Sequence, residues 1–184
     1  MSEVLWAISR ASGIVSLLLF TGTIVLGILT WHGRPLPGLP RFAVSVVHRD
    51  VSLLATVFLG IHIVTLLGDP YAQVRLIDFF VPFLAAADPF WRGLGTVAAD
   101  LLVAVIITSV ARHRLPAIVF RAIHWAVYPL WALALAHGLG SGTDAGSAWY
   151  LGLSVAALAT VLAAVGYRIA ASRRTVAATL DQRR

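Results

Sequence analysis

The sequence contains no cysteine and no lysine, and few of its residues are charged. The absence of cysteine excludes disulfides, iron–sulfur clusters, thiolate ligands and covalent haem attachment through C-x-x-C-H. Charged residues make up 12% of the chain and hydrophobic residues 59%, which is far from the composition of a soluble domain. We therefore predict an integral membrane protein.

The formal net charge of +6 comes from arginines at the ends of apolar runs. They form no continuous basic face with aromatic residues between them, so we expect no nucleic-acid partner. The N-terminal stretch lacks the strongly basic start and the cleavage site of a signal peptide, which favours a retained membrane span.

Five segments approach the length of about 20 apolar residues that a membrane-spanning helix needs. The intervening segment at about 70–92 is too interrupted by Asp and Pro to cross, and its aromatics fit an extracytoplasmic amphipathic segment at the membrane surface. The predicted fold is all-α, a five-helix integral membrane bundle formed by residues 1–184 as one transmembrane domain. The predicted spans are about 11–31, 42–67, 94–112, 117–138 and 149–171.

Arginine positions predict the orientation of this bundle, because cytoplasmic loops are enriched in basic residues. Five spans put the termini on opposite sides, and the arginine-rich side should be cytoplasmic. We therefore expect the N-terminus outside and the C-terminus in the cytoplasm of a multi-pass protein of a bacterial inner (plasma) membrane. The arginine-rich side receives Arg34, Arg41, Arg112, Arg114, Arg121, Arg168, Arg173, Arg174, Arg183 and Arg184, and the other side receives Arg10, Arg75 and Arg92.

Four histidines lie within two of the predicted spans. His48 and His62 are fourteen residues apart, which places them on nearly one helical face, about 21 Å apart along the axis. His124 and His137 are thirteen apart in the fourth span, which runs in the same direction. Depths therefore match, and we name His48 and His124 the inner pair and His62 and His137 the outer pair.

Histidine pairs at matched depth suit the binding of haem. Neutral imidazole is a strong axial ligand for haem iron, and ionisable residues inside spans usually mark function. Two such pairs predict two b-type haems, held without covalent bonds and stacked across the membrane as an electron path. The simpler alternative is that these histidines are interfacial residues hydrogen-bonded to their neighbours.

The fourth span presents a geometric difficulty. Thirteen residues of ideal helix turn about 140° short of four turns, so His124 and His137 do not share a face. Pro129 lies between them and can kink the helix. Alternatively, two haems approach this helix from different directions, and the sequence leaves both possibilities open.

Several other residues are candidates for cofactor contacts. Arg49, Arg121 and Arg41 could bind inner haem propionates, with Arg75 or Arg92 on the outer side. Contact with lipid phosphate is the better interpretation for any single arginine except Arg49, which lies beside His48 and inside the span. Trp131 is midway between His124 and His137 and could contact porphyrin or simply pack in the bundle.

Asp100 lies inside the third span, near the expected level of the outer pair. It could orient an outer ligand or relay a proton. A hydrogen bond to a neighbouring helix or an ion pair with Arg92 is an equally good interpretation. Small residues in the first span, namely Gly13, Gly22 and Gly27, favour close helix contact.

The spacing H-x13-H in one span and H-x12-H two spans later, with one arginine-rich side, resembles the transmembrane domain of ferric reductases and NADPH oxidases. The resemblance covers roughly residues 42–138. It implies two b haems that pass single electrons from a cytoplasmic flavin to an outer acceptor such as ferric iron, dioxygen or a periplasmic protein. It makes His48 and His124 the inner ligands and His62 and His137 the outer ones.

The sequence also departs from that family's common pattern. Members commonly have six spans and often a fused flavin and nicotinamide domain, whereas five spans and no G-x-G-x-x-G motif occur here. The resemblance therefore implies the membrane electron-transfer component of an oxidoreductase, with a separate cytoplasmic flavin/NAD(P)H reductase or a membrane quinone as the donor. Alternatives are a quinol-linked haem subunit of a periplasmic reductase system and a haem-free membrane scaffold or assembly protein.

Overall fold

The computed structural model describes residues 2–32 and 40–181, and for 2, 31, 32, 41 and 174–181 it describes the backbone alone. Three arginines that enter the predicted sidedness, Arg34, Arg183 and Arg184, lie outside the described residues. Within the described ranges all regular structure is helical.

Five helical stretches are long and apolar enough to cross a membrane, which confirms the predicted all-α fold with five spans. The fourth stretch is made of two helices that follow one another. The elements are α1 (Ser2–His32), α2 (Arg41–Gly68), the short 3-10 helix η1 (Leu76–Phe79), α3 (Pro89–Val110), the 3-10 turn η2 (Arg112–Arg114), α4 (Ala117–His124), α5 (Val127–Ser141) and α6 (Ala148–Asp181).

The helices extend beyond the apolar segments from which they were predicted. Helix α3 begins at Pro89, so residues 89–92 belong to this helix and not to the predicted surface segment. Proline suits the first helical position because its missing N–H has no partner there in any case. Helices α1 and α6 likewise continue past polar residues, since backbone hydrogen bonding does not require an apolar sequence.

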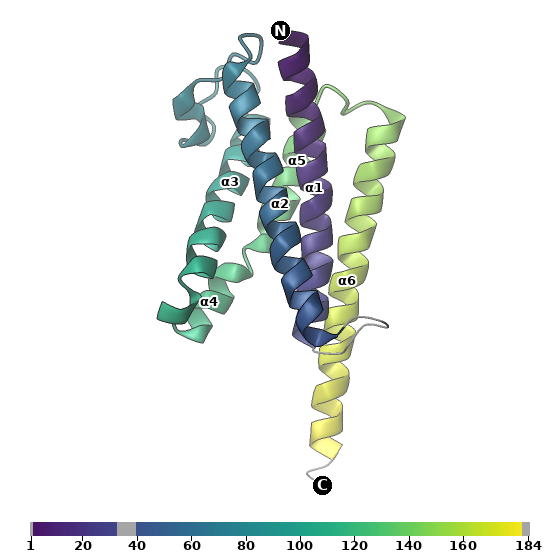
Figure 1. Ribbon diagram of the computed structural model, residues 1–184. Helices are drawn as coiled ribbons and strands as arrows, with labels where there is room; N and C mark the ends of the chain where they lie inside the picture. Colours follow the sequence, from purple (N-terminus) through teal and green to yellow (C-terminus); the bar gives the residue numbers. More distant parts are fainter. Residues whose placement is uncertain (1, 33–39, 182–184) are drawn as a thin grey trace.

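Helix α1 lies at the centre of the arrangement (Figure 1). It packs along α2 and also contacts α5 and α6, while α3 packs against α4 and α5. The described chain begins at one end of the bundle, and α6 carries it beyond the other helices at the opposite end. The connection between α2 and α3 lies at the end where α1 begins, and η2 lies at the end where α6 projects.

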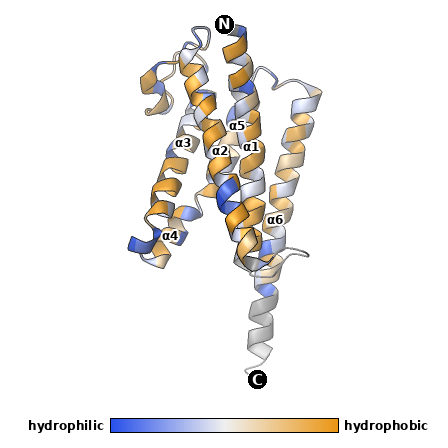
Figure 2. Cartoon of the chain, viewed as in Figure 1, coloured by the Kyte–Doolittle hydropathy of each residue, from blue (hydrophilic) through white to orange (hydrophobic). Residues whose placement is uncertain are grey.

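The packed core is shared by α1, α3, α5 and α6. Hydrophobic residues run along most of the length of the helices (Figure 2), and many large apolar side chains are exposed. Leu53, Val64 and Ile107 are each at least 60% exposed. A soluble protein avoids so much exposed apolar surface, but a bilayer solvates it. The core residues are Leu17, Ile24, Ile28, Ala98, Leu102, Leu130, Trp131, Leu135, Ala157 and Val161.

Small polar residues fill the inner face of α1. Four of them are buried, whereas many large apolar side chains are exposed, so the usual distribution in a soluble protein is inverted here. The four are Ser9, Ser12, Ser16 and Thr21. The Ser16 hydroxyl donates a 2.9 Å hydrogen bond to the carbonyl of Ala55, which is completely buried on α2. Small side chains of this kind let two helices approach closely in a membrane.

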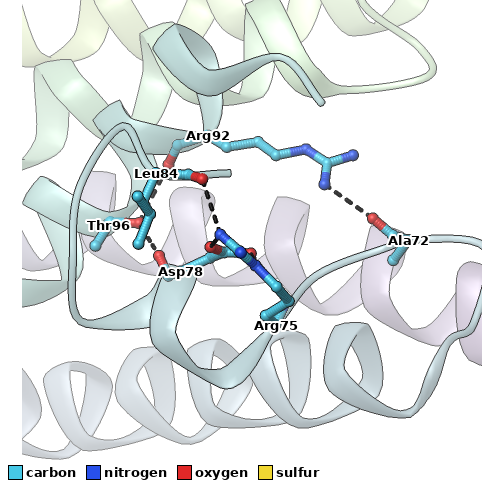
Figure 3. A network of polar contacts seen from close by, with 6 residues as sticks. All are labelled: Ala72, Arg75, Asp78, Leu84, Arg92 and Thr96. Carbon is cyan, nitrogen blue, oxygen red and sulfur yellow. Dashed lines mark hydrogen bonds and ion pairs between the residues drawn. The ribbon is translucent and has the colours of Figure 1, made fainter. Parts of the chain in front are cut away.

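The connection between α2 and α3 is held by the polar network in Figure 3. The Asp78 carboxylate accepts hydrogen bonds from the Arg75 backbone N–H at 2.9 Å and from Nη2 of the same arginine at 2.7 Å. The Thr96 hydroxyl donates to the Asp78 carbonyl at 2.8 Å, and Arg92 donates to the carbonyl of Ala72 at 2.8 Å. These bonds fasten the connection to the first turns of α3.

Packing also fixes this connection to α3. Phe83 has a φ of 65°, in the left-handed region, and its ring lies directly over Gly93, where an added Cβ would collide with it. The predicted surface segment is therefore a folded layer over the start of α3. Its exposed aromatics include Tyr71, Phe80 and Phe83.

We expect Asp78→Asn to loosen this layer. The hydrogen bonds from Arg75 hold the pKa of the Asp78 carboxyl below its usual range. The stabilisation is therefore fully present above the ordinary carboxyl pKa of about 3.9 and is lost as the pH falls through the lower folded value. Hydrogen exchange at neutral pH should become faster across residues 75–88 in the variant, and its pH dependence below about 4 should weaken.

The matched control is Asp88→Asn, because the Asp88 side chain makes no capping hydrogen bond at the start of α3. Its exchange should match that of the unaltered protein. Equal exchange in Asp78→Asn and Asp88→Asn would show that the carboxylate of Asp78 does not hold the layer.

Candidate functional site

The structure brings together the two histidine pairs that the sequence predicts. His48 on α2 faces His124 at the end of α4, with ring centres 6.4 Å apart and ring planes at 67°. His62 on α2 faces His137 on α5, with ring centres 6.5 Å apart and planes at 79°. Both pairs therefore have nearly the same geometry at two levels of the bundle.

The ring separation fits a metal ion between the rings. An imidazole nitrogen binds a metal at about 2 Å. Because each nitrogen also lies about 1 Å from the centre of its own ring, rings on opposite sides of one ion have centres about 6 Å apart. A direct hydrogen bond between two imidazoles, with about 2.9 Å between nitrogens, would bring the centres to about 5 Å. The observed 6.4 and 6.5 Å agree with the first arrangement.

Each pair supplies two ligands, which suits an ion already held by a macrocycle. Within the described residues no group of three or more His, Asp or Glu side chains could enclose a metal ion. A tetrahedral zinc site is therefore disfavoured, since it needs three or four protein ligands. Two axial imidazoles are the complete protein contribution to a six-coordinate haem iron.

Backbone carbonyls of neighbouring helices orient three of the four rings. His62 Nδ1 lies 2.8 Å from the Ser9 carbonyl, and His48 Nδ1 lies 3.1 Å from the Thr23 carbonyl, both on α1. His137 Nδ1 lies 2.9 Å from the carbonyl of Trp91 on α3.

These bonds also determine which ring nitrogen is available to a metal. A carbonyl only accepts hydrogen bonds, so Nδ1 must carry the proton in these three rings. The other nitrogen, Nε2, then keeps its lone pair free for a metal, as in many metal-binding histidines.

His124 is held differently from the other three histidines. Its Nδ1 is buried and has no hydrogen-bond partner in the described part of the chain. Its ring stacks on Phe120, with centres 5.2 Å apart and planes at 27°. The inner pair therefore has one hydrogen-bonded ring and the outer pair has two.

The fourth span is interrupted directly after His124. Helix α4 ends there, and α5 starts at Val127. Pro129 has no N–H to donate to the carbonyl of Trp125, and its ring crowds that carbonyl, so the regular ladder fails at this point. The Ala126 N–H bonds instead to Ile123, one residue short of the α-helical partner. The fourth span is therefore broken at residues 125–126, within one turn of Pro129, which agrees with the disruption by Pro129 that was one of the two possibilities left open by the sequence.

Of the arginines predicted for the inner side, Arg49 and Arg121 are both exposed, and the side chain of Arg41 lies outside the described residues. Arg49 forms an ion pair with its neighbour Asp50 at 3.0 Å, and its side chain is 69% exposed. Arg121 is exposed on α4, one turn before His124. Their contact with propionates stays a prediction.

Trp131 and Asp100 lie in contrasting environments. Trp131 is 3% exposed in the core, and its indole N–H donates a 2.9 Å hydrogen bond to the Thr21 hydroxyl. Asp100 is exposed on α3, and neither histidine of the outer pair uses it, because carbonyls occupy both Nδ1 positions. Arg92 is bonded to Ala72 and not to Asp100. A contact of Trp131 with porphyrin and a proton relay through Asp100 stay predictions.

Sequence reasoning missed Arg168, which it counted only as a basic residue at the end of a span. Its guanidinium donates a 2.7 Å hydrogen bond to the Tyr128 hydroxyl and lies 4.5 Å from the ring centre of Trp125. The dipeptide Tyr167–Arg168 near the end of an apolar run gave no signal of this contact.

A family described as "Ferric reductase like transmembrane component" matches residues 12–135, more than half of the chain. The chain belongs to this family. The match includes His48, His62 and His124 and ends just before His137. No curated protein and no solved structure matches the chain.

Membership in the ferric reductase-like transmembrane family indicates a multi-pass membrane protein that takes part in electron transfer across the membrane. Domains of this family are generally haem-binding and work with redox partners in a bilayer. The predicted resemblance to ferric reductases is thereby confirmed.

We expect Thr21→Val to destabilise the contact between α1 and α5. The change leaves the buried Trp131 N–H without its acceptor, which costs about 1–3 kcal/mol. Thermal denaturation in detergent should show a lower midpoint. Thr30→Val is the control, because the exposed Thr30 hydroxyl bonds to Leu26 of its own helix. If both variants melted at the same temperature, the indole bond would contribute nothing to stability.

Proposed function

We propose that this chain binds two b-type haems and carries single electrons across the membrane between a cytoplasmic donor and an extracytoplasmic acceptor. The observation that carries the proposal is the geometry of the two histidine pairs, whose ring centres are 6.4 and 6.5 Å apart. That geometry recurs at two levels of a bundle whose family is linked to transmembrane electron transfer.

In this proposal His48 and His124 would hold the haem on the inner side, and His62 and His137 would hold the haem on the outer side. The Nε2 atoms of these rings would be the nitrogens available to iron. The carbonyls of Ser9, Thr23 and Trp91 accept the Nδ1 protons, which fixes the ring orientation and makes the ligands more basic. When bound, the two haems would supply one-electron redox centres within an apolar bundle.

The spacing on α2 sets the length of the proposed electron path. Fourteen residues of helix separate His48 from His62 by about 21 Å along the axis, which covers much of a hydrocarbon core of about 30 Å. The arginine distribution supports an inner side at the His48 end, where η2 carries Arg112 and Arg114.

We infer that the electron donor is a separate cytoplasmic flavin/NAD(P)H reductase. The sequence has no G-x-G-x-x-G motif that could hold a nucleotide. The basic cytoplasmic face would attract a partner with an acidic surface. The outer acceptor would be ferric iron, dioxygen or a periplasmic protein.

The test begins with purified protein from cells supplied with haem. A reduced-minus-oxidised spectrum should have b-type bands, with about two haems per chain. His62→Ala should remove the outer haem and His48→Ala the inner haem, each with the other retained. His113→Ala is the control, because His113 is exposed on η2 and belongs to neither pair.

Three results would count against parts of this proposal. A protein without haem would exclude electron transfer through these histidines and favour a scaffold or assembly role. Loss of a haem in His113→Ala, to the same extent as in His62→Ala or His48→Ala, would contradict the assigned pairs. Reduction by quinol, and not by a flavin reductase with NAD(P)H, would favour the quinol-linked subunit.

The interruption after His124 gives an independent test. Pro129→Ala restores the missing N–H and should allow α4 and α5 to join as one regular helix. His124 would then turn away from His48, since thirteen residues of regular helix separate it from His137 by about 140° of rotation. We expect loss of the inner haem with the outer haem retained, measured by haem content and spectrum. A normal inner haem would show that the kink does not position His124.

A further inference from the structure

The three carbonyls that hold histidine rings share a feature of sequence. In each case the residue four positions after the carbonyl is glycine. The pairs are Ser9 with Gly13, Thr23 with Gly27, and Trp91 with Gly95, and they face His62, His48 and His137 respectively.

Each of these glycines lies against the ring itself. A Cβ added to Gly13 would be 2.9 Å from Nδ1 of His62, and one added to Gly95 would be 2.8 Å from Nδ1 of His137. A Cβ added to Gly27 would be 3.3 Å from Cε1 of the His48 ring. Ordinary van der Waals contacts are about 3.5–4.0 Å, so a methyl group at Gly13 or Gly95 would displace the ring.

Helix geometry explains why the glycine must stand at this position. Side chains tilt toward the N-terminus of their helix, so the side chain of residue i+4 stands beside the carbonyl of residue i. For the same reason Ser and Thr hydroxyls bond to carbonyls three or four residues earlier. Glycine at i+4 therefore uncovers the carbonyl to a donor from another helix, while the carbonyl still accepts its own backbone hydrogen bond.

We propose that Gly13, Gly27 and Gly95 are positioning residues for haem ligands, each uncovering a helix carbonyl that accepts the Nδ1 proton of one histidine. This inference rests on the proposed function, because it concerns how the rings are held toward iron. The glycines touch the rings and not the metal.

The spacing of the glycines in α1 supports this role. Gly13 and Gly27 are fourteen residues apart, as are His48 and His62 on the adjacent helix α2. Because α1 and α2 run in opposite directions and the two intervals are equal, Gly13 lies beside His62 and Gly27 lies beside His48. Gly22 lies between the two positions on α1, and an added Cβ there would meet nothing within 4 Å.

The fourth histidine has no such arrangement. Nδ1 of His124 is buried and has no hydrogen-bond partner in the described part of the chain. None of the described glycines lies against its ring as Gly13, Gly27 and Gly95 lie against the other three rings.

The experiment compares alanine at each glycine in the full-length, haem-loaded protein. Redox titration followed by optical spectroscopy measures a midpoint potential for each haem, and His48→Ala and His62→Ala identify which haem is which. We expect Gly13→Ala and Gly95→Ala to raise the potential of the outer haem or to lose that haem. A ring without its carbonyl partner is a weaker donor and stabilises the oxidised iron less.

Gly27→Ala should act on the inner haem alone, with a smaller upward shift because its Cβ contact is longer. Gly22→Ala is the matched control on the same helix and should leave both potentials unchanged. Alanine favours helix more than glycine does, so a weakened helix cannot account for losses in the other variants.

Each outcome distinguishes the inference from the proposed function. The positioning role would be overturned if the unaltered protein held two haems and if the midpoint potentials in Gly13→Ala and Gly27→Ala matched those in Gly22→Ala. The proposed function would then remain intact. Equal shifts in the midpoint potentials of both haems in Gly27→Ala would also overturn the positioning role. Alanine at this position requires only a small displacement of the His48 ring, so shifts at both haems would indicate a general packing effect. Absence of haem from the unaltered protein would overturn the proposed function itself.

Discussion

The hydrogen bond from an imidazole Nδ1–H to the backbone carbonyl of a neighbouring helix is the interaction on which this arrangement depends. In an apolar environment an unpaired ring N–H is costly, and three of the four imidazoles have a carbonyl acceptor for it. Helix α1 supplies two acceptors to α2, and α3 supplies one to α5. The bonds that satisfy the rings therefore also fix how far one helix is shifted along another.

Helix α1 contains no ligand histidine within its predicted span, and yet it organises both pairs. Its small residues allow close contact with α2, and the bond from Ser16 to Ala55 reinforces that contact. On another side, Thr21 accepts the Trp131 hydrogen bond from α5. Because α1 contacts both helices that carry the outer histidines, it sets the separation between their rings.

Helical periodicity explains which parts of this structure could be predicted. Rise and twist per residue are nearly constant, so apolar run lengths predicted five spans, and the spacing of four histidines predicted which rings meet. The interruption after His124 was only one of two possibilities, since a proline can kink a helix or be accommodated by its neighbours. Asp100 and Trp131 were chosen as candidate cofactor contacts from their depth in the membrane. Depth does not specify the direction in which a side chain points, so it could not predict that Asp100 is exposed or that Trp131 lies in the packed core.

The sequence by itself determined the helices, the depth of each histidine and the chemistry that an imidazole pair can perform, because these depend on local geometry and residue type. Only the tertiary structure decided which carbonyls hold the rings and that, among the described residues, none holds His124. Every residue carries a backbone carbonyl, so residue type alone does not show which carbonyl a ring will use. Gly13 and Gly27 were interpreted as aids to close helix contact, and their position under the rings became visible only when α1 was placed against α2.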